Sequence, residues 1–332
     1  MKLWKIYEND IPLHILEVAS TPTMQRLKHI GMSCGCEYTS FARFQKCPTY
    51  TRYDHSLGVA LIIWHFTRDI KQSIAGLLHD VATPVFAHVV DFLHNDYLKQ
   101  EYTESNTESI ILSDKQLVSI LTKYNLSVND VKDYHKYPIA DNDAPKLSAD
   151  RLEYTLGNLV HYGLRTKDIV VRYYNNIIVK RNEYGTPELM FKDMDIAESF
   201  SRDSLLCSKV YTSDEDRYSM QVLANILRNA MSDHVINEID LYTTEKFVIQ
   251  KLQLNNKHNK KWKIYCSYSK VITSPIQQFD KEWIYVNAKK RYINPSVVGK
   301  GRVSNISSIF ENELLSYQQE EFNYWICGIC DS

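Results

Sequence analysis

The sequence predicts a mainly α-helical fold with a smaller α+β region towards its C-terminal end. Gly and Pro number only 10 and 9 in 332 residues, which favours helices over many short strands joined by tight turns. Apolar residues recur at helical spacing through the first two thirds of the chain. After about residue 236, runs such as EWIYVNA at 282–288 are rich in residues that favour strands. We therefore expect one domain over 1–235 and an α+β accessory region over 236–332.

The individual elements follow from apolar spacing and from residues that start or stop helices. Pro22 follows Thr21 and begins a periodic run that ends at Gly31. Residues 175–191 predict a hairpin, whereas the basic segment 255–263 predicts a loop and 262–272 a strand. The same periodicity predicts further helices over about 54–64, 71–79, 84–93, 104–113, 115–124, 146–162, 193–211, 216–232 and 243–254.

Charge and cysteine content exclude several function classes. Lys and Arg total 39 against 40 Asp and Glu, so no global field attracts nucleic acid or an anionic membrane, and any anion must be held by a local cluster. The N-terminus resembles no signal peptide, and the longest apolar stretch, 59–64, is far too short to span a membrane. Seven cysteines in a chain of this size indicate reduced thiols. We expect a cytoplasmic protein that does not contact a membrane.

Two histidines and two aspartates near predicted helix ends suggest a metal site. His55 starts one helix, His79 and Asp80 end another, and Asp150 begins a third. Imidazoles and carboxylates together suit one divalent ion such as Mn, Fe, Ni or Zn, with Mg as a further candidate. Such an ion lowers the pKa of its water and polarises a phosphoryl group. The His-Asp dipeptide alone would be better explained as a buried, hydrogen-bonded histidine or a solvent-facing pair.

The segments around these four residues strengthen the hypothesis of a metal site. TPTMQRLKHIGM (21–32), TRYDHSLGVA (51–60), AGLLHDVATPVFAH (75–88) and SADRLEYTLGN (148–158) occur in this order. Together they resemble the HD-domain metal-dependent phosphohydrolases, and within them the deoxynucleotide triphosphohydrolase branch, over about 20–165. The resemblance implies an HD-domain helical core and a metal ion bound by His55, His79, Asp80 and Asp150.

The resemblance also implies residues that contact substrate. Arg52 corresponds to the arginine that meets the substrate phosphates, and Arg151 to a second phosphate contact. Tyr154 corresponds to the tyrosine that packs on the sugar, and Gln25 to the glutamine that binds the sugar 3′-hydroxyl. Asn158 stands where the family often has an aspartate that serves the same hydroxyl. Without the resemblance, salt bridges would explain both arginines, Tyr154 would be a core aromatic residue and Gln25 a solvated helix residue.

Two positions depart from the family pattern. Thr83 and Thr103 stand where the family usually has histidines that protonate the leaving group or bind phosphate. Threonine cannot act as a general acid near neutral pH. His88 keeps its family position as a phosphate ligand or acid, so we expect His88 and Asp80 to be the catalytic residues. Asp91, nearby, either orients a histidine, holds a water or is purely structural.

Weaker signals come from cysteines and basic clusters. Cys34, Cys36, Cys47, Cys327 and Cys330 have spacings that zinc sites use, although free thiols explain them better. Basic residues with Trp262 and Tyr292 among them suggest a nucleotide or nucleic-acid site, an oligomer contact or, more simply, solvated loops. These basic residues are Lys257, Lys260, Lys261, Lys263, Lys289, Lys290, Arg291, Lys300 and Arg302. The resemblance to commonly oligomeric enzymes adds a homo-oligomer to the expectations.

Two function hypotheses follow. The first is a divalent-metal phosphohydrolase acting on nucleotides, foremost deoxynucleoside triphosphates or other deoxynucleotide phosphates. The residues matched to the sugar pocket favour a triphosphate substrate, whereas the two missing histidines favour a monophosphate ester. The alternative is a metal-containing nucleotide sensor or regulatory protein with little turnover, motivated by Thr83 and Thr103. The complete set of four candidate metal ligands argues against that alternative.

Overall fold

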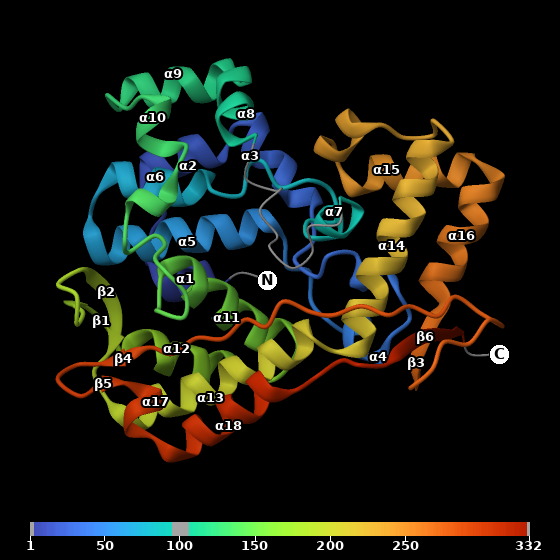
Figure 1. The fold of residues 1–332 in the computed structure, drawn as a ribbon. Coiled ribbons are helices and arrows are strands. Elements are labelled where there is room, and N and C mark those ends of the chain that lie inside the picture. The colour runs from blue at the N-terminus through green and yellow to red at the C-terminus, as the bar shows by residue number, and fades with distance from the viewer. Residues whose placement is uncertain (1–2, 95–105, 331–332) are drawn as a thin grey trace.

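The computed structural model of the chain describes residues 3–94 and 106–330. Helices dominate it and the strands are short, so the prediction of a mainly α-helical fold with a small α+β C-terminal region is confirmed (Figure 1). No helix in these two ranges is long and apolar enough to cross a membrane.

The first half of the chain forms short helices around two longer ones. The α-helices are α1 (Trp4–Tyr7), α2 (Leu13–Ala19), α3 (Pro22–Arg26), α4 (Ala42–Gln45), α5 (Arg52–Thr67), α6 (Ile70–Leu78), α7 (Val89–Leu93), α8 (Thr107–Ser113), α9 (Lys115–Lys123), α10 (Val128–Val131) and α11 (Ala149–His161). Short 3-10 turns cover Leu27–His29, Cys36–Tyr38 and Tyr134–Lys136.

The second half adds long helices and two small sheets. Its elements are α12 (Lys167–Asn175), β1 (Ile177–Arg181), β2 (Pro187–Phe191), α13 (Met194–Tyr211), α14 (Asp214–Ser232), a 3-10 turn at Glu238–Tyr242, α15 (Glu245–Leu254), α16 (Asn256–Ser267), β3 (Tyr268–Ser274), β4 (Ser296–Val297), β5 (Gly301–Arg302), α17 (Val303–Ile306), α18 (Ser308–Gln319) and β6 (Trp325–Cys330). The hairpin β1–β2 continues through β4 to β5, with β2 and β4 parallel, while β3 pairs antiparallel with β6.

Three helix starts that matter for function are fixed by side-chain caps. Thr51 caps α5 in a reciprocal capping box with Asp54. Asp69 caps α6 by accepting from the Gln72 backbone N–H, and Ser148 caps α11 by accepting from that of Arg151. Caps satisfy backbone donors that would otherwise lack partners, and so they fix where each helix begins. The candidate metal ligands lie at the start of α5, after the end of α6 and in the first turn of α11.

Two hydrophobic clusters hold the molecule together. One packs α1, α2, α5, α6 and α11 and also takes Ile293 and Phe310 from the end of the chain. The other lies around α14 and includes Trp262, Val286 and Ile326. Residues after 236 thus enter both clusters, and the domain boundary near that residue stays a prediction.

The C-terminal region differs from the sequence-based expectation at residues 255–272 and 282–288. Residues 255–263 were predicted to be a loop and 262–272 a strand, but α16 covers most of both segments. Asn255 caps this helix by accepting from two backbone N–H groups, and the helix buries His258, Trp262 and Tyr265 on one side. The many lysines on the exposed side led to the prediction of a loop, although the buried residues have helical spacing. The β-rich run at 282–288 forms only a single bridge, between Ile284 and Ile326.

The segment before α7 is also not helical as predicted. Phe86 and Ala87 have positive φ angles of 59° and 48°. Two successive residues other than glycine in this region are strained, so α7 begins only at Val89. The strained turn leads directly into His88, one of the expected catalytic residues.

Candidate metal centre and active site

Four side chains from three helix ends converge on one point. His55 Nε2 lies 3.2 Å from His79 Nε2 and 3.1 Å from Asp150 Oδ1. His79 Nε2 lies 3.7 Å from Asp80 Oδ2 and 3.8 Å from Asp150 Oδ1. Within residues 3–94 and 106–330, His55, His79 and Asp80 form the one group of three or more potential ligands found to converge. The structure therefore brings together all four predicted ligands.

The outer nitrogens of both imidazoles are already engaged. His55 Nδ1 lies 2.6 Å from Glu153 Oε2, and His79 Nδ1 lies 2.7 Å from the Gly76 carbonyl oxygen. Carboxylate and carbonyl oxygens only accept, so each Nδ1 must carry the proton. In the neutral rings both Nε2 lone pairs then face one another. Only a cation between them, a proton or a metal ion, makes this arrangement favourable.

The charges around the two histidines also favour a cation between them. Burial opposes a charged His55, yet hydrogen bonds to Asp150 and Glu153 raise its pKa to about 10. Burial would likewise raise the pKa of Asp150, but its hydrogen bond with His55 and nearby positive charges lower it to about 2. Two imidazole nitrogens and two carboxylates form a mixed donor set that suits a divalent transition metal. The residues thus fit the ion that the sequence predicted.

Glu153 is a site residue that the sequence analysis did not identify. It is 1% exposed, and its carboxylate also accepts from the hydroxyls of Tyr50 at 2.6 Å and Tyr7 at 3.2 Å. A Cβ at Gly58 would lie 2.5 Å from its Oε1 atom, so glycine leaves room for it. Glu153 follows Asp150 by three residues on α11, and this spacing was the available signal. Its role here is to fix the orientation and tautomer of His55.

Asp80 is positioned by two neighbours. Thr83 Oγ1 donates to Asp80 Oδ1 at 2.8 Å, and Arg52 contacts Asp80 Oδ2 at 3.1 Å. Burial alone would raise the pKa of Asp80, but the charges of Arg52 and the two histidines hold it well below its usual range. Thr83 therefore supports a candidate ligand. Thr103, the other departure, lies outside the described residues.

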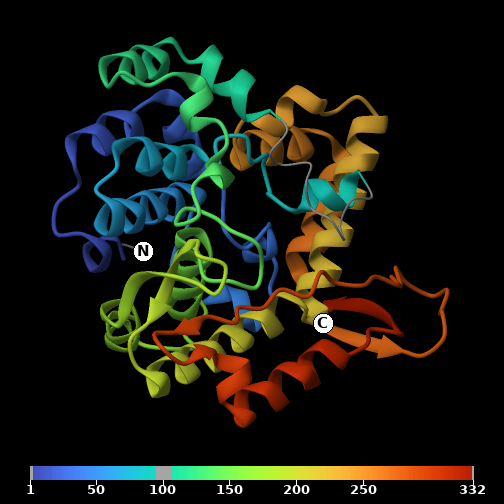
Figure 2. The same cartoon turned by 60° about the vertical axis from the view of Figure 1, so that its left-hand side comes forward.

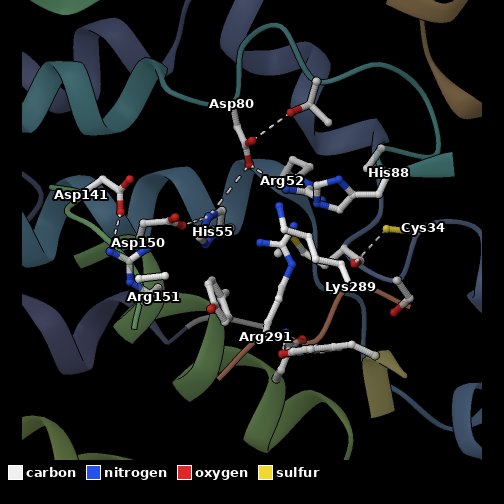
Figure 3. A pocket seen from close by; sticks show the side chains of 18 of the residues that line it. Cys34, Arg52, His55, Asp80, His88, Asp141, Asp150, Arg151, Lys289 and Arg291 are labelled. Carbon is white, nitrogen blue, oxygen red and sulfur yellow. Dashed lines mark hydrogen bonds and ion pairs between the residues drawn. The ribbon is translucent and has the colours of Figure 1, made fainter. Parts of the chain in front are cut away.

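A cavity of about 860 Å³ opens beside this cluster (Figure 3). Its wall includes Arg52, His88, Asp141 and Arg151 along with the four candidate ligands. Residues 288–292 of the C-terminal region also line it, including Lys289 and Arg291. The sequence analysis had noted these two cations in a basic cluster but could not place them at the site, because nothing local links residue 291 to residue 80.

His88 lies in the cavity wall and is held by a buried carboxylate. His88 Nδ1 lies 2.9 Å from Oδ2 of Asp91, which is fully buried. Asp91 thus orients a histidine, one of the roles considered for it. Burial lowers the pKa of His88, and the charges of Arg291 and Arg52 add to that effect although Asp91 opposes it. The lowered pKa favours the neutral form of His88, in which Nδ1 donates to Asp91 and Nε2 is an acceptor.

The predicted substrate-binding residues divide into two groups. Arg52, Tyr154 and Asn158 line the cavity together with Arg151. Gln25 does not line it, and its side chain contacts the Ala19 carbonyl at 2.7 Å and Lys28 at 2.6 Å.

Arg151 is engaged by the loop that precedes α11. It contacts Asp141 at 2.9 Å, the Lys146 carbonyl at 2.6 Å, and both the carbonyl and side-chain oxygens of Asn142. This is the salt-bridge alternative considered from the sequence. Arg52 and Asn158 differ, because Arg52 Nε and Asn158 Oδ1 are buried without a hydrogen-bond partner among the described residues. Both residues line the cavity, and each has one buried polar atom that is not satisfied by the described residues.

Comparisons with known proteins identify relatives of this chain. No protein-family model matches the chain. The chain is 30% identical over 244 residues to the protein YdhJ of Bacillus subtilis, described as uncharacterized, and the match covers 71% of this chain and 70% of that protein. It is 26% identical over 149 residues to the metal-dependent phosphohydrolase cns2 of Cordyceps militaris, and this match covers 45% of this chain and 41% of that protein.

A solved structure extends the likeness over the whole fold. A phosphohydrolase from Bacteroides thetaiotaomicron superposes with a TM-score of 0.65 over 97% of each chain, at 14% sequence identity. At that identity the likeness concerns the fold alone. The match to the Bacillus protein shows that this chain and YdhJ belong to one family. The converging His and Asp side chains fit the HD-domain metal-dependent phosphohydrolases that the sequence resembles.

We expect the purified protein to contain about one divalent transition metal ion per chain, held by the four converging ligands. The double change His79→Ala with Asp80→Ala removes two donors and should abolish the bound metal, measured by elemental analysis. His65→Ala is the matched control, because His65 lies on α5 with His55 but contacts Glu8 instead. Unchanged metal content in the double variant would refute the assignment of these ligands.

Glu153→Gln should weaken metal binding without removing any ligand. The amide keeps the size of the side chain but not the carboxylate that orients His55, so we expect affinity to fall about 10- to 100-fold. Competition with a chelator measures this change. Glu17→Gln, a change on α2 next to Lys123, is the control. Equal affinity in wild type and Glu153→Gln would show that the His55 ring does not depend on this contact.

Proposed function

We propose that this phosphohydrolase binds one divalent ion at His55, His79, Asp80 and Asp150 and hydrolyses nucleotides, foremost deoxynucleoside triphosphates. The observation that carries the proposal is a single cavity lined by the candidate metal ligands, by Tyr154 and Asn158, and by several cations. Its volume of about 860 Å³ falls in the range of sites for nucleotide-sized ligands.

Two unsatisfied polar atoms support a nucleotide rather than a small phosphate ester. Arg52 Nε is a buried donor that can serve a phosphate oxygen beside the metal ligands. Asn158 Oδ1 is a buried acceptor that can serve a sugar hydroxyl. Tyr154 lies one helical turn before Asn158 on α11 and provides an aromatic surface for the sugar. A ligand that serves both Arg52 and Asn158 must contain a phosphate group and a sugar.

The residues around the metal site can then be given roles. A divalent ion bound there would polarise a phosphoryl oxygen and lower the pKa of a bound water. Arg52 holds phosphate charge and keeps Asp80 in place, while Thr83 fixes the other oxygen of Asp80. Neutral His88, with its proton on Nδ1 towards Asp91, presents a nitrogen that can accept a proton. We therefore assign His88 as a general base rather than the acid expected from the sequence.

Arg151 has a different role in this proposal. Its contacts with Asp141 and Asn142 fix the loop that forms one side of the cavity, so Arg151 shapes the site instead of binding phosphate. The sensor hypothesis loses part of its basis, because Thr83 has a positioning role compatible with turnover. The names of the relatives also favour a hydrolase over a sensor.

A nucleotide panel tests the proposed activity. Protein loaded with Mn²⁺ is incubated with deoxynucleoside mono- and triphosphates and ribonucleoside triphosphates, and phosphate and tripolyphosphate are measured separately. We expect a deoxynucleoside and tripolyphosphate from the deoxynucleoside triphosphates. The His79→Ala, Asp80→Ala double variant is the blank. Release of phosphate from monophosphates alone would replace the triphosphate assignment with a monoesterase, and no turnover of any nucleotide would overturn the proposed substrate class.

The pH dependence tests the role of His88. Below its pKa His88 is an imidazolium that cannot accept a proton, so kcat/KM should rise with pH through a value below 6.5. His88→Gln should remove that rising limb and lower the rate by about 10²- to 10⁴-fold. His94→Gln is the control, because His94 does not line the cavity. If wild type instead shows a falling limb above pH 6.5 that His88→Gln removes, His88 donates the proton.

A further inference from the structure

The C-terminal region sends one extended segment across the cavity of the candidate active site. Residues 286–294, which we call the strap, run between the β3–β6 pair and the small sheet that contains β4 (Figures 1 and 2). The strap contains no strand of its own. Its middle residues, 288–292, line the same cavity as His55 and Asp80.

One end of the strap is fixed by a buried arginine. Val286 is 2% exposed, and its carbonyl accepts a hydrogen bond from Nη1 of Arg217. Arg217 is fully buried on α14, contacts Asp214, and stacks over the ring of Phe322 at 4.3 Å from the centroid. A buried guanidinium with several fixed partners is a rigid anchor.

The middle and the other end of the strap are also held by specific contacts. Lys290 Nζ donates to the Gln318 carbonyl at 2.7 Å and to the Glu320 carbonyl. Ile293 is 2% exposed in the first hydrophobic cluster, and the Asn294 backbone N–H donates to the Pro145 carbonyl at 2.8 Å. The strap therefore joins both hydrophobic clusters, and it is held on either side of the cavity.

This anchoring directs two cations at the site. Side chains alternate along an extended segment, so Lys289 and Arg291 lie on the side opposite to Lys290, which is held by the α18 end. Figure 3 shows both side chains reaching into the cavity towards Arg52 and His55. Arg291 lines the same cavity as His88 and Tyr154, and its positive charge acts to lower the pKa of both side chains.

The acidic side chains that line the cavity each have an identified contact. Asp80 and Asp150 face the candidate metal position, and Asp141 pairs with Arg151. Asp143 pairs with Lys146, and Asp216 accepts from the Cys36 thiol. Lys289 and Arg291 add their positive charges to that of Arg52 in the same cavity. Closely spaced cations in a partly enclosed site favour a ligand with several negative charges. A phosphate chain has that charge distribution, and Arg and Lys bind it by charge-assisted hydrogen bonds.

We propose that the strap is the polyphosphate-binding part of the active site, with Lys289 and Arg291 binding the phosphates that extend beyond the one at the metal cluster. The strap then selects substrates with a phosphate chain over monophosphates. This inference rests on the proposed function, since it assigns a chain of phosphates to the same cavity. It gives the C-terminal region a direct part in substrate binding.

Binding of inorganic tripolyphosphate tests the strap without a base, a sugar or turnover. The full chain is titrated with tripolyphosphate and, separately, with inorganic phosphate, while free Mn²⁺ is held constant. In the double variant Lys289→Gln, Arg291→Gln we expect tripolyphosphate affinity to fall on the order of 10- to 100-fold for each side chain. Phosphate affinity should stay within about twofold, because no strap contact reaches the metal-bound phosphate in the proposal.

The control removes the same charge just outside the strap. Lys281→Gln with Lys300→Gln changes two exposed lysines and should leave both affinities unaltered. Lys289→Arg with Arg291→Lys keeps the charge and should restore most of the tripolyphosphate affinity. Thermal unfolding of each variant checks that the fold is intact, and none of these side chains lies in a hydrophobic cluster.

The outcomes separate this inference from the proposed function. If the double variant binds tripolyphosphate as tightly as wild type, or loses phosphate and tripolyphosphate affinity equally, the strap does not bind the distal phosphates. If no nucleotide is hydrolysed but the double variant loses only tripolyphosphate affinity, the substrate proposal fails while the strap assignment stands. If nucleotides are hydrolysed and the strap variants bind tripolyphosphate unchanged, only the strap assignment fails.

Discussion

The close approach of two imidazole nitrogens, which needs a proton or a metal ion between them, is the constraint on which the site depends. His55 Nε2 and His79 Nε2 lie 3.2 Å apart, each with its other nitrogen committed to a fixed acceptor. Neither ring can turn to relieve this contact without breaking a buried hydrogen bond. The cost of burying Glu153 is offset by three donors, from His55, Tyr7 and Tyr50. The protein therefore carries a polar centre that only a cation can satisfy.

The helices around this centre serve to fix distances between segments far apart in the sequence. Caps at Thr51 and Ser148 fix the starts of α5 and α11, so their first turns present His55 and Asp150 to each other. The loop after α6 is held from outside by Arg26, whose guanidinium donates to the carbonyls of Val81 and Thr83 at 2.8 Å each. The strained turn at Phe86 and Ala87 then delivers His88 to the cavity. Strain of this kind persists only where the surrounding contacts impose it.

The features that could be predicted from the sequence are those that a local pattern or a matched motif determines. The four candidate ligands stand in short segments whose residue types carry their chemistry, so their convergence on one point was predictable from the chain. The hairpin at 175–191 was an equally local feature. Helices α2, α12 and α18 were not predicted, and their buried apolar residues pack in the first hydrophobic cluster.

The surroundings of the other candidate site residues depend on tertiary structure and could not be predicted from the sequence. Arg151 was expected at the phosphate, but the loop at 141–146 engages its guanidinium, and no pattern in the sequence shows that loop folding back. Gln25 matched a motif position, yet the turn after α2 directs its amide to Ala19. Lys289 and Arg291 were seen only as part of a basic cluster, since their place at the cavity depends on contacts across the whole molecule. The domain boundary, a homo-oligomer, contact with nucleic acid and a cytoplasmic location stay predictions.

The position of the strap in the chain affects how the site is assembled during synthesis. The four candidate ligands are complete at Asp150, whereas Lys289 is translated about 140 residues later. At typical elongation rates this delay is roughly 7 to 28 s. Throughout that interval the ligand-bearing helices lack the segment that later lines one side of the cavity and joins both hydrophobic clusters. The nascent chain thus exposes the ion position to solvent more widely than the finished protein does, and the order of synthesis separates formation of the ligand cluster from completion of the substrate cavity.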